Sequence, residues 1–435
     1  MLIYTSHSTP RIEYIFTYFK EKLFVDLEVT SDSEFFKAYK NSKLNYTTER
    51  ITNEEFFIQP TGLLHQYTIK KQPVDCFEWK QTKAFYKTDD DLGFDIFSAS
   101  FYLLSRYEEY LEYEPDEYSR YAHWNSLAWK EDFLNKPLIE IWLKKFSELL
   151  THRFTTPNSQ LTTFNFIPTY DIDIAWSFKH KGFWRNLVAS ILKPASIVQR
   201  LKVLAEKEKD PFDCYNWLHL FHSKYELKPI YFFLVAKERS KLDKNSSPKK
   251  KHLQQLIQRT KQIADIGLHP SVFSNTAKEY LLNEKNTLQQ IARSNITKSR
   301  HHYLKFFLPH TYRELIGAGI TDEYSMGYGT VNGFRASTSN SFLWFDLEKE
   351  EITCLRIHPF SFMEANSFYE LHQSPTEALT ELKQLYAEVK NVNGTFITIF
   401  HNQFLGTDKM FIGWKEMYEE FVHFVIPRNE ESDEQ

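Results

Sequence analysis

The second half of the chain alternates between apolar runs and segments whose apolar residues recur with helical spacing. Strand-like runs occupy residues 164–174, 230–235 and 394–403. The run at 230–235 lacks polar alternation, which is usual for a strand that is buried on both faces of a helix-covered parallel sheet. Helical spacing between the runs predicts helices at 201–204, 217–221, 252–263, 280–292, 311–318 and 375–389.

Shorter strands are expected at 266–271, 300–304 and 320–328, each after one of these helices. Repeated helix-to-strand units predict an α/β domain with a parallel sheet or barrel. In such folds the functional site lies at the carboxyl ends of the strands.

The first half of the chain has a different pattern, with shorter and more scattered elements. We expect strands at 2–4, 55–58 and 66–69 and helices at 12–23, 95–110 and 139–146. Residues 151–163 are polar and rich in Thr, Ser, Asn and Pro, which is loop composition. The sequence therefore predicts a smaller α+β domain at 1–155 and an α/β domain at 160–430.

The helix expected at 95–110 carries an apolar stripe that should pack inward. The stripe consists of Phe97, Phe101, Leu104 and Tyr107. Its polar residues, Arg106, Glu108 and Glu109, are expected on an ion-paired outer face. A recognition surface is the alternative.

Composition and charge narrow the classes of function. The 435 residues carry a net charge of −4, and no long basic patch interleaved with aromatic residues is present. This argues against a nucleic-acid partner. Aromatic residues make up 17% of the chain, which is a weak hint of sugar binding because most of them should lie in the core.

The cysteines and the amino terminus exclude other classes. Three cysteines without Cys-x-x-Cys spacing indicate neither a disulfide framework nor a thiolate zinc site, so a metal would need oxygen and nitrogen ligands. No signal-like segment begins the sequence, and no run of about 18 apolar residues occurs. We therefore expect a cytoplasmic protein without an integral membrane segment, and the sequence carries no signal of its oligomeric state.

Two carboxylates at the end of the strand 164–174 are the first sign of chemistry. Asp171 and Asp173 are two residues apart, so on a strand they project to the same side. Two buried carboxylates aimed at one spot repel each other unless a cation or a shared proton is present. The pair therefore favours a metal site, and hydrated carboxylates or helix caps are the alternative.

Other unusual polar residues fall at the ends of the other expected strands. His269 ends one strand, Arg300 and His302 lie on one face of another, and His401 lies near the end of 394–403. If these strands are parallel neighbours, their side chains meet the two aspartates at one rim of the sheet.

These segments resemble the NodB-type polysaccharide deacetylases, carbohydrate esterase family 4, over about residues 164 to 424. The resemblance is closest to a branch common in Bacteroidetes that carries an uncharacterised domain in front. The front-domain resemblance rests on the run 101–110. The remaining motifs are 169–173, 267–271, 300–304, 324–328 with 333–335, and 400–402.

The resemblance implies an irregular (β/α)7-type barrel and a divalent metal, typically zinc. It implies that Asp171 is a catalytic aspartate, that Asp173 and His269 bind the metal, and that His401 is a general acid. Arg300 matches the family's arginine motif. The implied activity is that of a hydrolase acting on the C–N bonds of linear amides, which removes acetyl groups from an N-acetylated sugar.

The second motif departs from the family pattern. The usual second histidine, four residues after His269, is replaced by Phe273. His302, on the same expected strand face as Arg300, is the natural substitute ligand and would complete a set of three protein ligands. The departure also favours an alternative, a non-catalytic carbohydrate-binding or assembly protein on a degenerate deacetylase fold.

The proposed roles agree with elementary chemistry. A divalent metal polarises an amide carbonyl and lowers the pKa of a bound water. Asp171 would take the proton of that water, and a protonated His401 would donate to the leaving amine. Arg300 would hold Asp171 in place through a charge-assisted contact.

Three further residues are candidates for contacts with substrate. Tyr303 follows His302 in the same motif. Arg335 would bind an acidic sugar or the acetyl product, with a structural ion pair as the alternative. Glu323 would orient Arg300, with a surface acid as the alternative. The expected substrate is a carbohydrate, and the absence of an export signal favours an intracellular precursor such as a lipid-linked or nucleotide-linked glycan.

Overall fold

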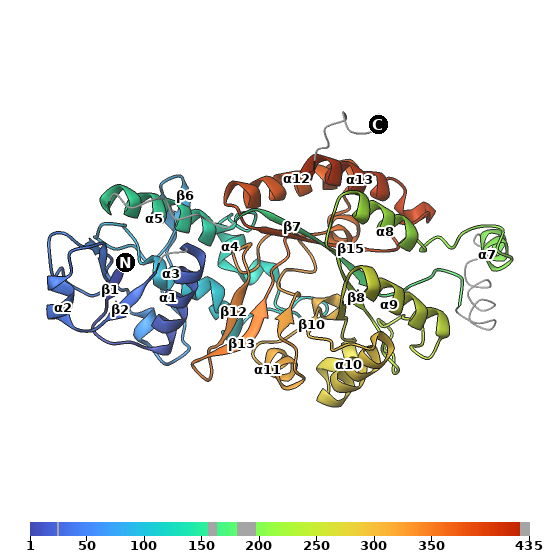
Figure 1. The fold of residues 1–435 in the computed structure, drawn as a ribbon, viewed down its shortest axis with the longest axis horizontal. Coiled ribbons are helices and arrows are strands. Elements are labelled where there is room, and N and C mark those ends of the chain that lie inside the picture. The colour runs from blue at the N-terminus through green and yellow to red at the C-terminus, as the bar shows by residue number, and fades with distance from the viewer. Residues whose placement is uncertain (24–25, 155–162, 181–196, 427–435) are drawn as a thin grey trace.

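The computed structural model describes residues 1–23, 26–154, 163–180 and 197–426. A smaller group of elements from the first 154 residues lies at one end of the molecule, and a larger sheet with its helices forms the rest (Figure 1). The expected domain boundary falls at residues 155–162, outside the described residues, so the division into two domains stays a prediction.

The smaller group is built on a parallel four-stranded sheet with the order β2-β1-β3-β4. Its strands are β1 (Leu2–Tyr4), β2 (Glu28–Thr30), β3 (Lys43–Asn45) and β4 (Phe56–Phe57). The helices α1 (Pro10–Leu23), α2 (Ser33–Ala38), α3 (Ile96–Leu104), α4 (Leu127–Lys130) and α5 (Leu138–Phe154) accompany it. A two-stranded hairpin, β5 (Phe77–Trp79) and β6 (Thr82–Ala84), completes it.

The strand expected at 66–69 does not form. Leu63–His65 is a short 3-10 helix, and the chain after it has no strand partner in the described residues. The Tyr107 hydroxyl instead donates to the Thr68 carbonyl and accepts from the Lys70 amide. A buried side chain therefore takes up backbone groups that a strand would have paired.

The helix expected at 95–110 ends early, and its polar residues are not on an outer face. Asp95 caps α3, and Arg106 has a left-handed backbone (φ 53°) that separates α3 from a 3-10 turn at Tyr107–Tyr110. Arg106 and Glu109 are buried and paired, with Nε and Oε1 2.8 Å apart. The prediction of an exposed, ion-paired outer face is therefore wrong, because Glu109 also pairs with Arg335 from the second half of the chain.

The larger sheet has nine strands in the order β12-β13-β11-β10-β9-β8-β7-β15-β14, parallel except for the pair β12 and β13. The strands are β7 (Asn165–Ile172), β8 (Ile230–Phe233), β9 (Asp265–Leu268), β10 (Lys298–Ser299), β11 (Asp322–Glu323), β12 (Phe342–Asp346), β13 (Glu351–Ile357), β14 (Phe362–Met363) and β15 (Thr395–His401).

The expected parallel α/β architecture is present, but the sheet is not a closed barrel. Within the described residues β12 and β14 are its two edges, and no strand pairing joins them. The antiparallel β12 and β13 extend one edge instead of closing the sheet. The structure therefore confirms a mixed α/β fold but does not confirm the irregular (β/α)7-type barrel that the resemblance implies.

Helices accompany the sheet where helical spacing predicts them. They are α7 (Ile197–Leu204), α8 (Tyr215–Lys224), α9 (Lys251–Ile263), α10 (Lys278–Ala292), α11 (His310–Gly317) and α12 (Pro375–Asn391). A further helix, α13 (Trp414–Val425), lies outside the predicted ones. Figure 1 shows α8, α12 and α13 on one side of the central strands and α9, α10 and α11 on the other. No helix in the described part of the chain is long and apolar enough to cross a bilayer.

The strand expected at 300–304 does not form, and the strand expected at 320–328 is much shorter than predicted. β10 ends at Ser299, and His302–Leu304 forms a 3-10 turn in which Tyr303 and Leu304 have positive φ values of 58° and 50°. A left-handed backbone cannot continue a pleated strand. Residues 300–304 therefore form a compact turn at the end of the sheet, and β11 likewise covers only two residues of 320–328.

Candidate metal and catalytic site

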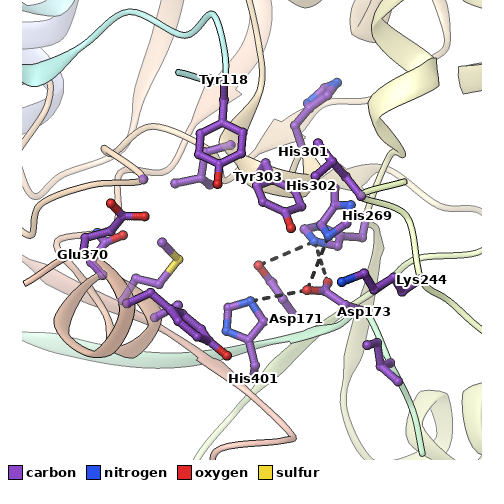
Figure 2. A pocket seen from close by; sticks show the side chains of 18 of the residues that line it. Tyr118, Asp171, Asp173, Lys244, His269, His301, His302, Tyr303, Glu370 and His401 are labelled. Carbon is purple, nitrogen blue, oxygen red and sulfur yellow. Dashed lines mark ion pairs between the residues drawn. The ribbon is translucent and has the colours of Figure 1, made fainter. Parts of the chain in front are cut away.

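The carboxyl ends of the central strands surround a pocket of about 440 Å³ (Figure 2). Asp171 is on β7, where it is in register with His401 on β15 and with Phe232 on β8. Asp173 and His269 directly follow β7 and β9. Six of the nine expected site residues line the pocket: Asp171, Asp173, His269, His302, Tyr303 and His401.

Asp173, His269 and His302 form a group that could hold a metal ion. One ligand atom from each residue lies within 4.8 Å of the others. The His269 Nε2 is 3.1 Å from Asp173 Oδ1, and the His302 Nε2 is 3.4 Å from Asp173 Oδ2. Asp173 Oδ1 is buried and has no hydrogen-bond partner in the described structure. One carboxylate and two imidazoles fit a catalytic zinc site with an open position.

Hydrogen bonds on the far sides of both imidazoles set the tautomers that a metal needs. His269 Nδ1 is 2.6 Å from the Arg300 carbonyl oxygen, and His302 Nδ1 is 2.8 Å from Asp243 Oδ1. Both oxygens accept, so each Nδ1 carries a proton, and the Nε2 atom of each ring is the one that faces Asp173 and would bind a metal ion in place of a proton. The two rings are therefore oriented as ligands.

The charges around His302 favour a cation. Burial acts to lower the pKa of His302, but Asp173 and Asp243 together raise it to about 9. Burial also acts to raise the pKa of Asp173, yet His302 and His269 hold it well below its usual range. Carboxylates that stabilise a proton on an imidazole also stabilise a metal ion in the same place.

Arg300 lies behind the pocket and holds Asp171. Its Nη1 donates to Asp171 Oδ1 at 2.9 Å and to Thr169 Oγ1 at 2.7 Å, and its Nε donates to the Tyr324 carbonyl at 3.0 Å. The buried guanidinium packs over the Phe232 ring, 4.5 Å from its centroid. Asp171 is therefore fixed in position by a charge-assisted hydrogen bond.

His401 lies on the opposite side of the two aspartates from the metal-ligand histidines (Figure 2). Its Nε2 is 3.7 Å from Asp173 Oδ2, and its Nδ1 is 2.8 Å from Glu364 Oε1. Burial acts to lower the pKa of His401, but Glu364 and the two aspartates raise it to about 10. His401 is therefore protonated at neutral pH and directs an N–H toward the pocket.

Arg335 does not reach the pocket. Its Nε and Nη2 donate to the two carboxylate oxygens of Glu109 at 2.9 and 2.7 Å, and its Nη1 donates to the Gly327 carbonyl. The side chain is buried. The expected substrate contact is wrong, and the structural ion pair is what the structure shows. The partner lies 226 residues away in the chain, so local sequence could not reveal it.

Glu323 is also absent from the pocket lining, and its carboxylate makes no hydrogen bond to Arg300 in the described structure. It accepts from the Ser325 amide at 2.9 Å and from the Tyr312 hydroxyl at 3.1 Å. Burial raises the pKa of this carboxyl group to about 7. The alternative of a surface acid is wrong, because Glu323 is buried. Its carboxylate holds the turn after β11, whose Tyr324 carbonyl accepts from Arg300, and the Arg300 charge acts to lower the pKa of Glu323. Any support of Arg300 by Glu323 therefore comes from charge and from this turn.

Sequence reasoning missed two carboxylates that orient the site. Asp243 lies just before a polar stretch that reads as a solvated loop, and Glu364 directly follows the short strand β14. An acidic residue after an apolar run was a usable signal for Glu364, whereas nothing local distinguishes Asp243. Phe273, which replaces the usual histidine, stacks on Tyr280 with ring centroids 5.7 Å apart and does not line the pocket.

Comparisons with known proteins found one family model and several distant solved structures. Residues 1–155 match the model of a family of unknown function, DUF7033. No curated protein matches the sequence. A putative polysaccharide deacetylase from Mycobacterium smegmatis is a similar solved structure, with 12% identity and a TM-score of 0.40 over 62% of this chain and 85% of that one.

Two other solved structures are more distant. Puue allantoinase has 8% identity and a TM-score of 0.35 over 60% of this chain and 84% of its own. IcaB from Ammonifex degensii has 11% identity and a TM-score of 0.24 over 38% of this chain and 86% of its own. Likenesses this distant assign no activity, so the site's own geometry has to indicate the function.

Proposed function

We propose that the protein is a metal-dependent hydrolase that removes acetyl groups from an N-acetylated sugar. The observation that carries the proposal is the meeting of three groups in one pocket. These are the ligand set Asp173, His269 and His302, the pair of Asp171 with Arg300, and the pair of His401 with Glu364. Nitrogen and oxygen ligands with two imidazoles favour zinc.

The residues on either side of the ligand set supply the proton transfers. A divalent ion held by Asp173, His269 and His302 would polarise the amide carbonyl and acidify a water molecule. Asp171, fixed by Arg300, is placed to accept a proton from that water. Since Arg300 uses both Nη1 and Nε for hydrogen bonds, the carboxylate keeps its orientation as the proton arrives.

His401 is placed to complete the reaction. Its Nδ1–H is held by Glu364, so the proton on Nε2 is the one that faces the pocket. Donation of that proton to the departing sugar nitrogen turns a poor leaving group into a neutral amine. Glu364 then stabilises the ring until it is protonated again.

Metal content and acetate release together test these roles. His302→Ala should lower bound zinc by at least tenfold, because it removes one of three ligands. His401→Ala should keep the zinc and lose acetate release by a factor of about 10² or more. His310→Ala is the matched control, since the exposed His310 pairs with Glu314 outside the pocket and should change neither quantity.

Two results would contradict the proposal. Equal zinc loss in the His302 and His401 variants would show that the assigned roles are wrong. A wild-type protein with one zinc per chain that releases no acetate from any N-acetylated sugar would favour the non-catalytic carbohydrate-binding alternative.

A further inference from the structure

One wall of the pocket comes from the first half of the chain. Tyr118 and Arg120 line the pocket together with Tyr303, although they lie in the region 1–155 that matches a family of unknown function. In Figure 2 the ring of Tyr118 stands beside that of Tyr303, with both hydroxyl groups directed toward Asp171 and His401. The two ring centroids are 5.3 Å apart.

The segment that carries Tyr118 is held by its own hydrogen bonds. An isolated β-bridge joins Pro115 to Tyr121 at its base. The Asp116 carboxylate accepts the backbone N–H groups of Tyr118 and Arg120, each at 2.9 Å, and also the Arg120 Nε at 2.7 Å. The position of Tyr118 is therefore set before any ligand arrives.

Arg120 connects this segment to the metal-ligand turn. Its guanidinium lies 4.8 Å from the centroid of the Tyr118 ring, and its Nη1 donates to the Tyr303 carbonyl at 2.6 Å. Tyr303 follows the candidate ligand His302 and has a left-handed backbone. A methyl group built on Gly329 would overlap the guanidinium, so the 329 loop packs directly on Arg120. One arginine thus holds both tyrosines.

We propose that Tyr118 and Tyr303 form a subsite for a second sugar ring, next to the one that carries the acetamide. This inference rests on the proposed function and names its substrate as an oligosaccharide. Tyr118 lines the pocket and is only half-buried, so the part of its ring that Arg120 and Tyr303 leave uncovered gives the pocket an apolar surface beside a polar hydroxyl, a combination that suits a pyranose ring. Pockets of roughly 300–1,000 Å³ hold ligands larger than one acetamide group.

The polar lining supports a ligand rich in hydroxyl groups. Lys244 and Glu370 also line the pocket and supply donors and acceptors beyond the two tyrosines. Figure 2 shows them on opposite sides of the aspartates, so hydroxyl groups at both ends of an extended glycan have partners. The region 1–155 thus acquires a role in substrate recognition.

Calorimetric binding to the full chain, kept free of divalent ions by a chelator, tests the subsite without turnover. The probes are N-acetylglucosamine and its β-1,4-linked tetramer. Wild type should bind the tetramer more tightly than the monomer. Tyr118→Ala should weaken tetramer binding by roughly three- to tenfold and leave monomer binding unchanged. Tyr118→Phe, which keeps the ring and removes the hydroxyl, should lose less tetramer affinity than Tyr118→Ala, and Tyr67→Ala, at an exposed tyrosine outside the pocket, should match wild type.

The outcomes separate the two proposals. Equal affinities of wild type for monomer and tetramer, or unchanged tetramer binding by Tyr118→Ala, overturn the subsite. If Tyr118→Ala loses tetramer affinity while zinc-loaded wild type releases no acetate, the subsite stands and the hydrolase proposal fails. If acetate is released and Tyr118→Ala binds the tetramer normally, only the subsite fails.

Discussion

His401 illustrates how single contacts define a chemical role. A buried imidazole is ordinarily neutral, because removal from water disfavours its charge. Here Glu364 accepts from both the Nδ1 and the backbone N–H of His401, at 2.8 and 2.5 Å, and two aspartates lie nearby. Their negative charges outweigh the effect of burial and raise the pKa to about 10. The ring is therefore a proton donor at neutral pH.

Glu364→Gln should move the alkaline limb of the pH–activity profile to lower pH. The donor must be protonated, so activity falls as the pH rises through the pKa of His401. Removal of the Glu364 charge lowers that pKa and brings the fall to lower pH. Acetate release measured between pH 6 and about pH 10 checks this. Glu416→Gln, at an exposed site on α13, should leave the profile unchanged. An unshifted limb would contradict the assignment of His401 as the acid.

At the scale of elements, the short strands β10 and β11 end early, and the turns that follow them carry residues of the site and its support. Arg300 and His302 follow β10, and Tyr324, whose carbonyl receives Arg300, follows β11. Glu323 closes the second turn by accepting from the Ser325 amide. The buried Glu323 carboxylate thus fixes the turn that follows β11.

The stability of wild type relative to Glu323→Gln should fall as pH rises. Burial raises the folded-state pKa of Glu323 from 4.5 to about 7, so the folded protein binds the proton more tightly than the unfolded chain. The protonated Glu323 therefore contributes its full stabilisation of the folded state below about pH 4.5. As the pH rises through 7, the free energy of unfolding of the wild type falls by up to about 3 kcal/mol. A neutral glutamine lacks this dependence.

Urea unfolding of both proteins between pH 5 and about pH 8 measures that difference. Glu284, whose pKa is also raised to about 7 by burial, is present in both proteins and cancels from the comparison. Glu351→Gln, at an exposed position on β13, is the control. A wild-type-to-variant difference that stays constant with pH would refute the raised pKa of Glu323.

At the scale of the whole molecule, buried charges join the two halves of the chain. Glu109 accepts from Arg106 beside it and from Arg335 in the second half. Burial acts to raise the pKa of Glu109, but the two guanidinium groups hold it below its usual range. The Glu350 carboxylate likewise binds Arg11 on α1. The wall that carries Tyr118 is therefore attached to the larger sheet by ion pairs.

Glu109→Gln should destabilise the protein by about 3–5 kcal/mol, because it leaves the buried Arg335 without its carboxylate partner and Arg106 with Glu108 alone, at 3.8 Å. The free energy of unfolding in urea measures the loss. Glu112→Gln, three residues on and exposed, should change stability by less than about 0.5 kcal/mol. Equal stability of the two variants would show that the buried cluster does not stabilise the fold.

The sequence by itself determined the mixed α/β type of fold and six of the residues that line the pocket. Apolar runs and helical spacing are local properties, so they correctly predicted β7, β8, β15 and the helices between them. Asp171, Asp173, His269 and His401 could be found because a parallel sheet brings strand ends to one edge. His302 also reached the pocket, although a turn rather than the expected strand carries it there.

Only the tertiary structure decided the contacts that complete the site. The open edges of the sheet, the pairing of Arg335 with Glu109, the support of His302 by Asp243 and the approach of Tyr118 to Tyr303 all depend on long-range packing. Periodicity reports which face of an element is buried, but not what covers it. These partners are far apart in the sequence, so no local pattern specifies them, and the chain must fold before their charges and rings meet.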